Sequence, residues 1–120
     1  YYLGGMINSG DEEQEEAAAR VGIFWPNQGN RGTHINVSGA GVTAAAGNPE
    51  AALALIEFLA NDDSQRWYAE TNNEYPVRDT VEPSDLLKSW GSFKADRVPM
   101  AELGRLNAEA VKAMDRANWR

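Results

Sequence analysis

Apolar residues recur at helical spacing along the second half of the chain. Residues 48–50, Asn-Pro-Glu, have the composition of a helix start, because Asn caps a first turn and Pro fits the first helical position. The residues that follow at the spacing of a buried stripe are Ala52, Leu55, Ile56 and Leu59. This pattern predicts a helix that buries one face.

Three further helices are predicted after it. Residues 61–64 break the first helix and cap a second over residues 65–72. A short helix over residues 84–90 ends at Gly91, and Pro99 opens the last helix. The inward residues of the short helix are Leu86, Leu87 and Trp90. The shared face of the last helix consists of Leu103, Leu106, Ala110, Val111 and Met114.

The first half of the chain contains two β-favouring runs. Residues 21–25 are apolar and stopped by Pro26, which predicts a buried strand. Residues 33–38 alternate, which predicts a strand with one polar face. Before them, the acidic run 11–16 predicts a solvated helix. Two strands are too few for a covered sheet, so we expect an α/β chain whose sheets are completed by other segments or by a second copy.

Composition and charge narrow the classes of partner. The chain has 120 residues, a formal net charge of -7 and no cysteine. The acidic balance argues against nucleic acid and against an anionic membrane surface, since both reward a basic patch. Without cysteine, disulfide frameworks and thiolate metal sites are excluded. No apolar run approaches the length of a membrane span.

Two motifs resemble functional sites, but the sequence around them does not support either one. Residues 39–44 match the G-x-G-x-x-A form of a dinucleotide loop, yet Gly47 interrupts where the motif needs a long helix. His34 is the only histidine, and a lone histidine in a strand is more often structural than a ligand or a base. The carboxylates lie in helix-surface contexts. No enzyme is indicated.

The adjacent tyrosines Tyr1 and Tyr2 are the remaining candidates. A phenol has a pKa of about 10, and a trivalent hard cation strongly favours its phenolate. Two phenolates therefore suit Fe(III) chemically. Neighbouring side chains point in different directions, so both reach one metal only at a bend such as a strand-to-helix junction. On residue chemistry alone, such a pair is more often packing.

Six stretches of the chain form an ordered set: residues 1–4 (YYLG), 24–28 (FWPNQ), 31–42 (RGTHINVSGAGV), 54–59 (ALIEFL), 73–77 (NEYPV) and 108–117 (AEAVKAMDRA). In these stretches and in their order, the chain resembles the C-terminal part of the ferric-iron substrate-binding proteins of ABC importers. They span nearly the whole chain, and the adjacent tyrosines are the family's functional signature.

The resemblance implies a division of the chain between two lobes of an α/β, type II periplasmic-binding-protein-like fold, of which this chain is a C-terminal fragment. Residues 1–32 would end the C-terminal lobe. Residues 33–120 would supply a crossing strand and helices that pack on the N-terminal lobe. By the same resemblance Tyr1 and Tyr2 are Fe(III) ligands, and the other ligands, including a possible synergistic anion, lie outside this chain. Many relatives carry a basic residue shortly after the tyrosine pair, where this chain has Gly5.

The function implied is the solute-binding component of an iron(III) importer. Such a protein is periplasmic or held at the cell surface, closes around Fe(III) and docks on a membrane permease. Two alternatives stay open: a relative that carries a different small anion, and a metal-free helical module that self-associates or pairs with the missing N-terminal part.

Overall fold

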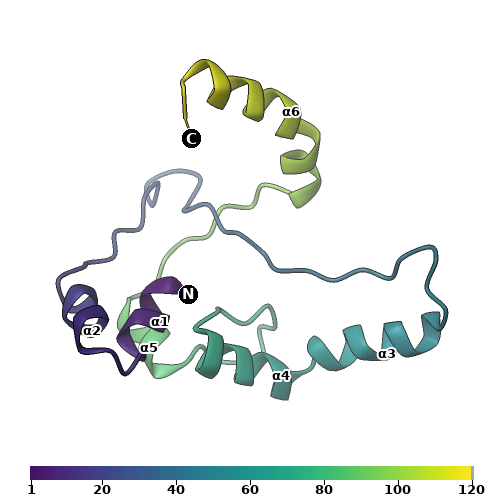
Figure 1. Ribbon diagram of the computed structural model, residues 1–120, viewed down its shortest axis with the longest axis horizontal. Coiled ribbons are helices and arrows are strands. Elements are labelled where there is room, and N and C mark those ends of the chain that lie inside the picture. Colours follow the sequence, from purple (N-terminus) through teal and green to yellow (C-terminus); the bar gives the residue numbers. More distant parts are fainter. Residues whose placement is uncertain (120) are drawn as a thin grey trace. The chain divides into compact units, whose positions relative to one another are not determined.

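The computed structural model describes residues 1–119 (Figure 1). Within this range the helical elements are α1 (Tyr2–Ile7), α2 (Glu12–Ala19), α3 (Pro49–Leu59), α4 (Asp62–Trp67), η1 (Tyr68–Asn72), α5 (Asp85–Ser89) and α6 (Met100–Arg116). They belong to two compact units. Unit 1 comprises residues 1–24 and 36–92, and unit 2 comprises residues 25–35 and 93–120. In the described residues, no helix is both long and apolar enough to cross a membrane.

Side-chain caps begin four of the helices in unit 1. Asn48 accepts a hydrogen bond from the Ala51 backbone N–H at 3.0 Å, so the predicted start of α3 is confirmed. Ser84 caps α5 where the sequence predicts a short helix. Asn61 accepts from the Ser64 N–H at 2.8 Å, and α4 therefore begins at Asp62, three residues before the predicted start.

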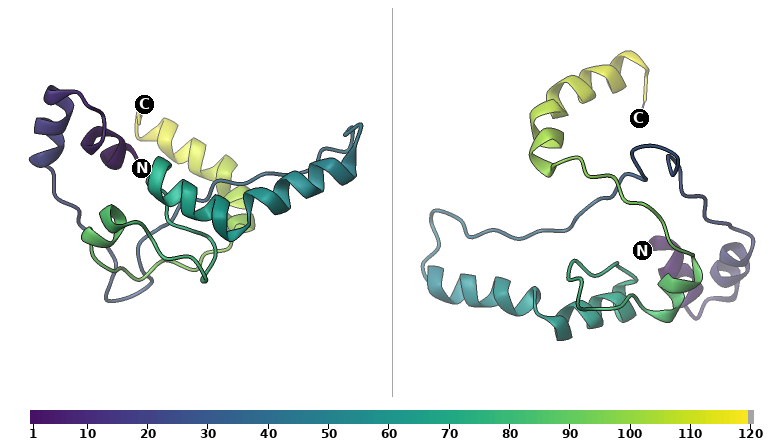
Figure 2. Two further views of the ribbon diagram at one scale, coloured as in Figure 1. Left: turned by 90° about the horizontal axis from the view of Figure 1, so that it is seen from below. Right: turned by 180° about the vertical axis from the view of Figure 1, so that it is seen from behind.

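Asp11 is the fourth cap, and it begins α2 inside the acidic run. Its carboxylate accepts from the backbone N–H groups of Glu13 and Gln14, and the exposed helix that follows agrees with the prediction. Hydrogen bonds from the Gln14 backbone and side chain, together with that from Glu13, lower the pKa of Asp11 from 3.8. Helix α1 packs beside α2, and all the views place them side by side (Figures 1 and 2).

Helix α4 continues into η1, a π-helical turn that ends at Asn73. Asn73 adopts the left-handed conformation, with φ 57° and ψ 39°, which Asn tolerates better than most residues. The chain then runs extended through residues 74–77, as predicted from the residue before Pro76. Figure 2 shows α3 and α4 following one another ahead of this turn.

The predicted strands at residues 21–25 and 33–38 are wrong. Neither run forms a strand in residues 1–119, and the single bridge in that range joins Thr33 to Ala95 in parallel. A lone extended segment leaves its backbone groups without a ladder partner, so an apolar run alone does not make a strand. The predicted burial of 21–25 also fails, since Phe24 is 85% exposed.

The core of unit 1 is small and surrounds η1 and α5. Ala69 and Leu87 are fully buried, so the inward direction predicted for Leu87 is confirmed. Buried Gln65 connects three segments, because its Nε2 donates to the Leu59 carbonyl at 2.9 Å and its Oε1 accepts from the Val77 N–H at 2.9 Å. This side chain joins the end of α3 to the extended segment after η1.

Unit 2 is held by residues 25–35 and the segment before α6. The rings of Trp25 and Phe93 stack with centroids 4.1 Å apart. Gln28 donates to the Lys94 carbonyl and accepts from the Lys94 N–H at 2.7 Å. Arg31 lies 3.5 Å from the buried carboxylate of Asp96.

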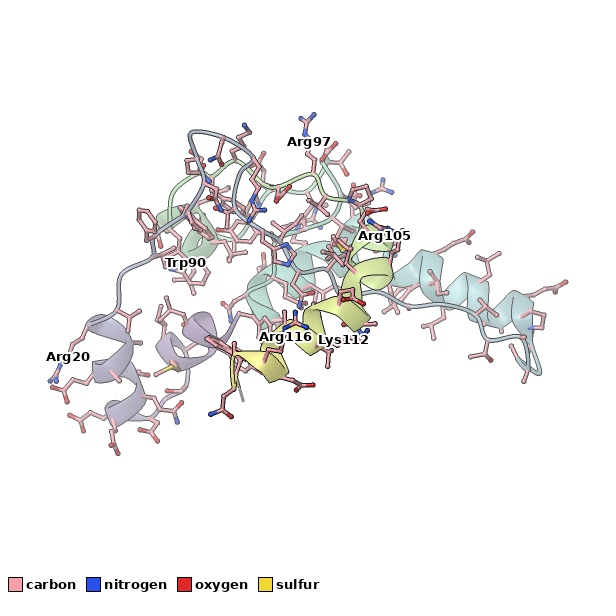
Figure 3. The ribbon with its side chains drawn as sticks, turned by 90° about the horizontal axis from the view of Figure 1, so that it is seen from above. Arg20, Trp90, Arg97, Arg105, Lys112 and Arg116 are labelled. Atoms are coloured by element: carbon pink, nitrogen blue, oxygen red, sulfur yellow. The ribbon has the colours of Figure 1, made fainter. Side chains whose placement is uncertain are left out.

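The buried stripes predicted for α3 and α6 are not buried. No residue of either helix falls in the buried class, and Leu55 of α3 is 57% exposed. On α6 the polar face is an ordinary solvated one, where Arg105 and Lys112 pair with acidic residues three positions earlier (Figure 3). The apolar spacing of both helices is real, but each unit contains too little chain to cover it.

Candidate functional site

The tyrosine pair lies at the start of α1. Tyr1 is the residue before the helix and Tyr2 is its first residue, so the pair spans the helix start. The two rings are in contact, with centroids 4.3 Å apart and planes inclined by 38°. They are 61% and 77% exposed. The structure therefore brings the predicted residues together and leaves them open to a ligand.

The two phenols influence each other. Hydrogen bonding with the Tyr2 hydroxyl is the main effect that raises the pKa of Tyr1 above its ordinary 10.0, and the charge on Tyr2, slight burial and the Glu74 carboxylate add to it. Without a cation, the Tyr1 phenol thus remains protonated at neutral pH. A cation that binds its oxygen has to displace that proton.

An open pocket of about 470 Å³ lies over the pair. The residues that line it are Tyr1, Tyr2, Gly5, Met6, Gln14, Thr71, Asn72, Asn73 and Glu74. They come from α1, α2 and the end of η1, all within unit 1. Glu74 is the one acidic or basic side chain among the lining residues, so the charge of the pocket is negative.

Close packing holds the end of η1 against α1. Gly4 is buried, and a Cβ placed on it would lie 2.4 Å from Cγ and 2.5 Å from Cβ of Asn73. Real Cβ atoms do not approach this closely, so only glycine lets α1 meet Asn73 here. This contact brings the residues around Glu74 beside the tyrosines.

Glu74 is half-buried and is fixed by its neighbours. Ser38 donates a hydrogen bond to its Oε1 at 3.3 Å. On one side of it Asn73 packs on Gly4, and on the other the Tyr75 hydroxyl donates to the Leu87 carbonyl at 3.3 Å. Sequence reasoning missed Glu74 as a pocket residue. Glu74 belongs to the NEYPV stretch, which contributes to the family resemblance but has no side-chain pattern that indicates a binding site.

The other candidates of the sequence do not join this pocket. His34 is exposed and belongs to unit 2. Residues 39–44 form a loop and turn that opens no helix, in agreement with the rejection of a dinucleotide site. Across residues 1–119 no cluster of three or more His, Asp or Glu side chains suits a metal ion.

Residues 4–95 match the family described as bacterial extracellular solute-binding protein. The chain belongs to this family. It is 43% identical over 120 residues to iron uptake protein A1 of Synechocystis sp., a match that covers all of this chain and 33% of that protein. The chain thus spans about a third of the length of its curated relative.

Solved structures agree with this family at the level of the fold. The Trichodesmium protein IdiA (FutA), solved in complex with iron and citrate, is 44% identical and superposes with a TM-score of 0.93. The ferric binding protein from Campylobacter jejuni is 38% identical, with a TM-score of 0.94. Each match covers all of this chain and 38% of the other. The predicted fold, that of a part of a periplasmic ferric-binding protein, is confirmed.

Proposed function

We propose that the chain is part of the solute-binding component of an iron(III) ABC importer, and that Tyr1 and Tyr2 bind Fe(III) as phenolates between two lobes. The observation that carries the proposal is the contacting, exposed phenol pair at the start of α1. Hard anionic oxygens are the donors that a hard trivalent ion prefers, so the donor set fits the cargo. The names of the relatives, an iron uptake protein and a ferric binding protein, support the same cargo.

The binding site in this proposal is completed by a part of the protein outside these 120 residues. The relatives are about three times as long, and the exposed apolar faces of α3 and α6 are surfaces that such a part would cover. Fe(III) binds the closed state preferentially and so draws the two lobes together.

Delivery follows from closure. The closed, loaded protein docks on a membrane permease, which takes up the ion from the periplasm or the cell surface. No bond of the cargo is made or broken except coordination, so the protein is a carrier and not an enzyme. A synergistic anion completes the coordination sphere where protein ligands leave a position open.

The test uses the complete two-lobed protein. Loading with Fe(III) is expected to produce a visible phenolate-to-iron charge-transfer band. Replacing both ligands (Tyr1→Phe with Tyr2→Phe) should remove the band and most of the affinity, whereas Tyr68→Phe, which changes a phenol outside the pocket, should leave both unchanged. A band that survives the double substitution would show that the ligands lie elsewhere.

An anion carrier is the weaker candidate. An anion site needs positive or N–H-rich surroundings, and the side chains that line this pocket include no Lys or Arg. A self-associating module remains the alternative for the 120-residue chain by itself, favoured by the exposed face of α6. Light scattering of the isolated chain at several concentrations separates a stable oligomer from a monomer.

A further inference from the structure

Glu74 is the residue of the tyrosine pocket that the proposed function leaves without a role. It lines the same pocket as Tyr1 and Tyr2 and is its single acidic or basic side chain. Its backbone is fixed on both sides, because Asn73 packs on Gly4 and Tyr75 bonds to the Leu87 carbonyl. A carboxylate held in this way is pre-organised and costs little entropy to use.

The carboxylate also has an oxygen to offer. Ser38 donates to Oε1 at 3.3 Å, and in residues 1–119 no hydrogen bond engages Oε2. One oxygen of this pocket-lining carboxylate is thus hydrogen-bonded to Ser38, and the other remains available to a ligand. This division of labour is typical of ligating carboxylates, which are themselves hydrogen-bonded by their surroundings.

The negative charge of Glu74 also fits a trivalent ion. Two phenolates leave one positive charge of a trivalent ion uncompensated, and Glu74 supplies the third negative oxygen. Gly5 lines the pocket, and a Cβ added to it would meet nothing within 4 Å. No basic side chain lines the pocket to hold an external anion in place of the carboxylate. Two phenolates and the Glu74 carboxylate therefore match the three positive charges of Fe(III).

We propose that Glu74 is a third, carboxylate ligand to the Fe(III) bound by Tyr1 and Tyr2, an inference that rests on the function proposed above. The ion draws its three anionic oxygens from two segments that lie 72 residues apart, the start of α1 and the end of η1. The glycine contact between these segments is then part of the metal site as well as of the fold.

The experiment compares Glu74→Gln with Glu70→Gln in the complete protein. Both remove one negative charge from the η1 region, but Glu70 lines a different pocket and serves as the matched control. Fe(III) is supplied as its nitrilotriacetate complex, and affinity is measured by competition with citrate. Glu74→Gln is expected to weaken binding by about 100-fold or more, above the roughly 10- to 100-fold range of residues that only orient a ligand.

The charge-transfer band gives a second, independent readout. Removing an anionic ligand makes the iron a better electron acceptor, so the phenolate-to-iron band of Glu74→Gln should move to longer wavelength, while Glu70→Gln keeps the wild-type band. Added bicarbonate should restore part of the lost affinity of Glu74→Gln alone, since it replaces the missing anion.

The outcomes separate this inference from the proposed function. If the wild-type band depends on the tyrosines and Glu74→Gln behaves like Glu70→Gln, Glu74 is no ligand and the tyrosine assignment stands. Weakened binding with an unmoved band reduces Glu74 to a positioning residue and overturns the proposal. If the band survives the double tyrosine substitution, the proposed function itself fails. Near-ultraviolet circular dichroism of the apo proteins checks that each variant is folded.

Discussion

The contact between Gly4 and Asn73 makes a sharp prediction about stability. In Gly4→Ala the new methyl group would lie 2.4 Å, 2.5 Å and 2.8 Å from Cγ, Cβ and Oδ1 of Asn73. Ordinary carbon contacts begin at about 3.5 Å. Asn73 cannot swing away cheaply, because its Cβ is fixed to a backbone in the left-handed region and the residue is 6% exposed. Either α1 or the end of η1 has to move.

The magnitude follows from two opposing effects. Replacing Gly by Ala inside a helix gains about 1 kcal/mol of helix propensity. Overpacking a tight contact costs roughly 1–3 kcal/mol. Gly5 stands next in the same helix, and a methyl group added there would have no neighbour within 4 Å, so Gly5→Ala keeps the gain without the cost. Gly4→Ala should therefore be less stable than Gly5→Ala by about 1–3 kcal/mol.

Urea unfolding of both variants, followed by tryptophan fluorescence, measures the difference. With an m-value of about 2 kcal/mol/M, the midpoints should differ by roughly 0.5–1.5 M. Asn73→Gly removes the obstructing side chain and suits the left-handed backbone, so it should cancel most of the penalty of Gly4→Ala in a double-mutant cycle. Equal midpoints for the two glycine variants, or no coupling to Asn73, would refute the packing of α1 on this residue.

Two further predictions concern the tyrosine pair and the buried core. Tyr2→Phe removes the main cause of the raised pKa of Tyr1, so the tyrosinate absorbance of Tyr1 should appear at lower pH than in the wild type. A raised phenol pKa stabilises the folded state below pH 10.0, and this contribution is lost as the pH rises past that value. The wild type should therefore lose this contribution to stability in the alkaline range. An unchanged titration would mean that the hydroxyls do not interact. Gln65→Leu leaves the Leu59 carbonyl and the Val77 N–H without their partner and should destabilise the protein by about 1–3 kcal/mol. Gln14→Leu, on the exposed face of α2, should change the stability little. Chemical denaturation of each variant measures the difference. If the two leucine variants unfold at the same urea concentration, the bonds of Gln65 add nothing to stability.

The sequence predicts the helices better than the burial. Local signals sufficed at Asn48 and Ser84, because a cap and its helix lie within one turn of chain. The strand predicted at residues 21–25 fails, since a strand depends on a partner that no local pattern contains. The faces of α3 and α6 have the right spacing, yet spacing cannot say whether a neighbour is present to cover them.

The site was predicted in part. Tyr1 and Tyr2 could be found because the family resemblance singles out adjacent tyrosines, whereas residue chemistry alone favours packing. The structure confirms that the two side chains meet. Their role as ligands stays a prediction. Glu74 could not be found from local pattern, because its neighbourhood depends on a glycine 70 residues earlier and on the left-handed turn at Asn73.

The length of the π-helical turn η1 affects the position of Glu74 relative to the tyrosines. A π turn holds one more residue than the α-helical turn it replaces, and each residue advances a helix by about 100°. Deleting one residue from 68–72 would let the turn relax to an α-helix and would rotate the Glu74 side chain away from the tyrosines by roughly that angle. The length of a single helical turn thus decides where the carboxylate lies relative to the phenols. A one-residue deletion within 68–70, which contribute no side chain to the pocket, would displace it in one step.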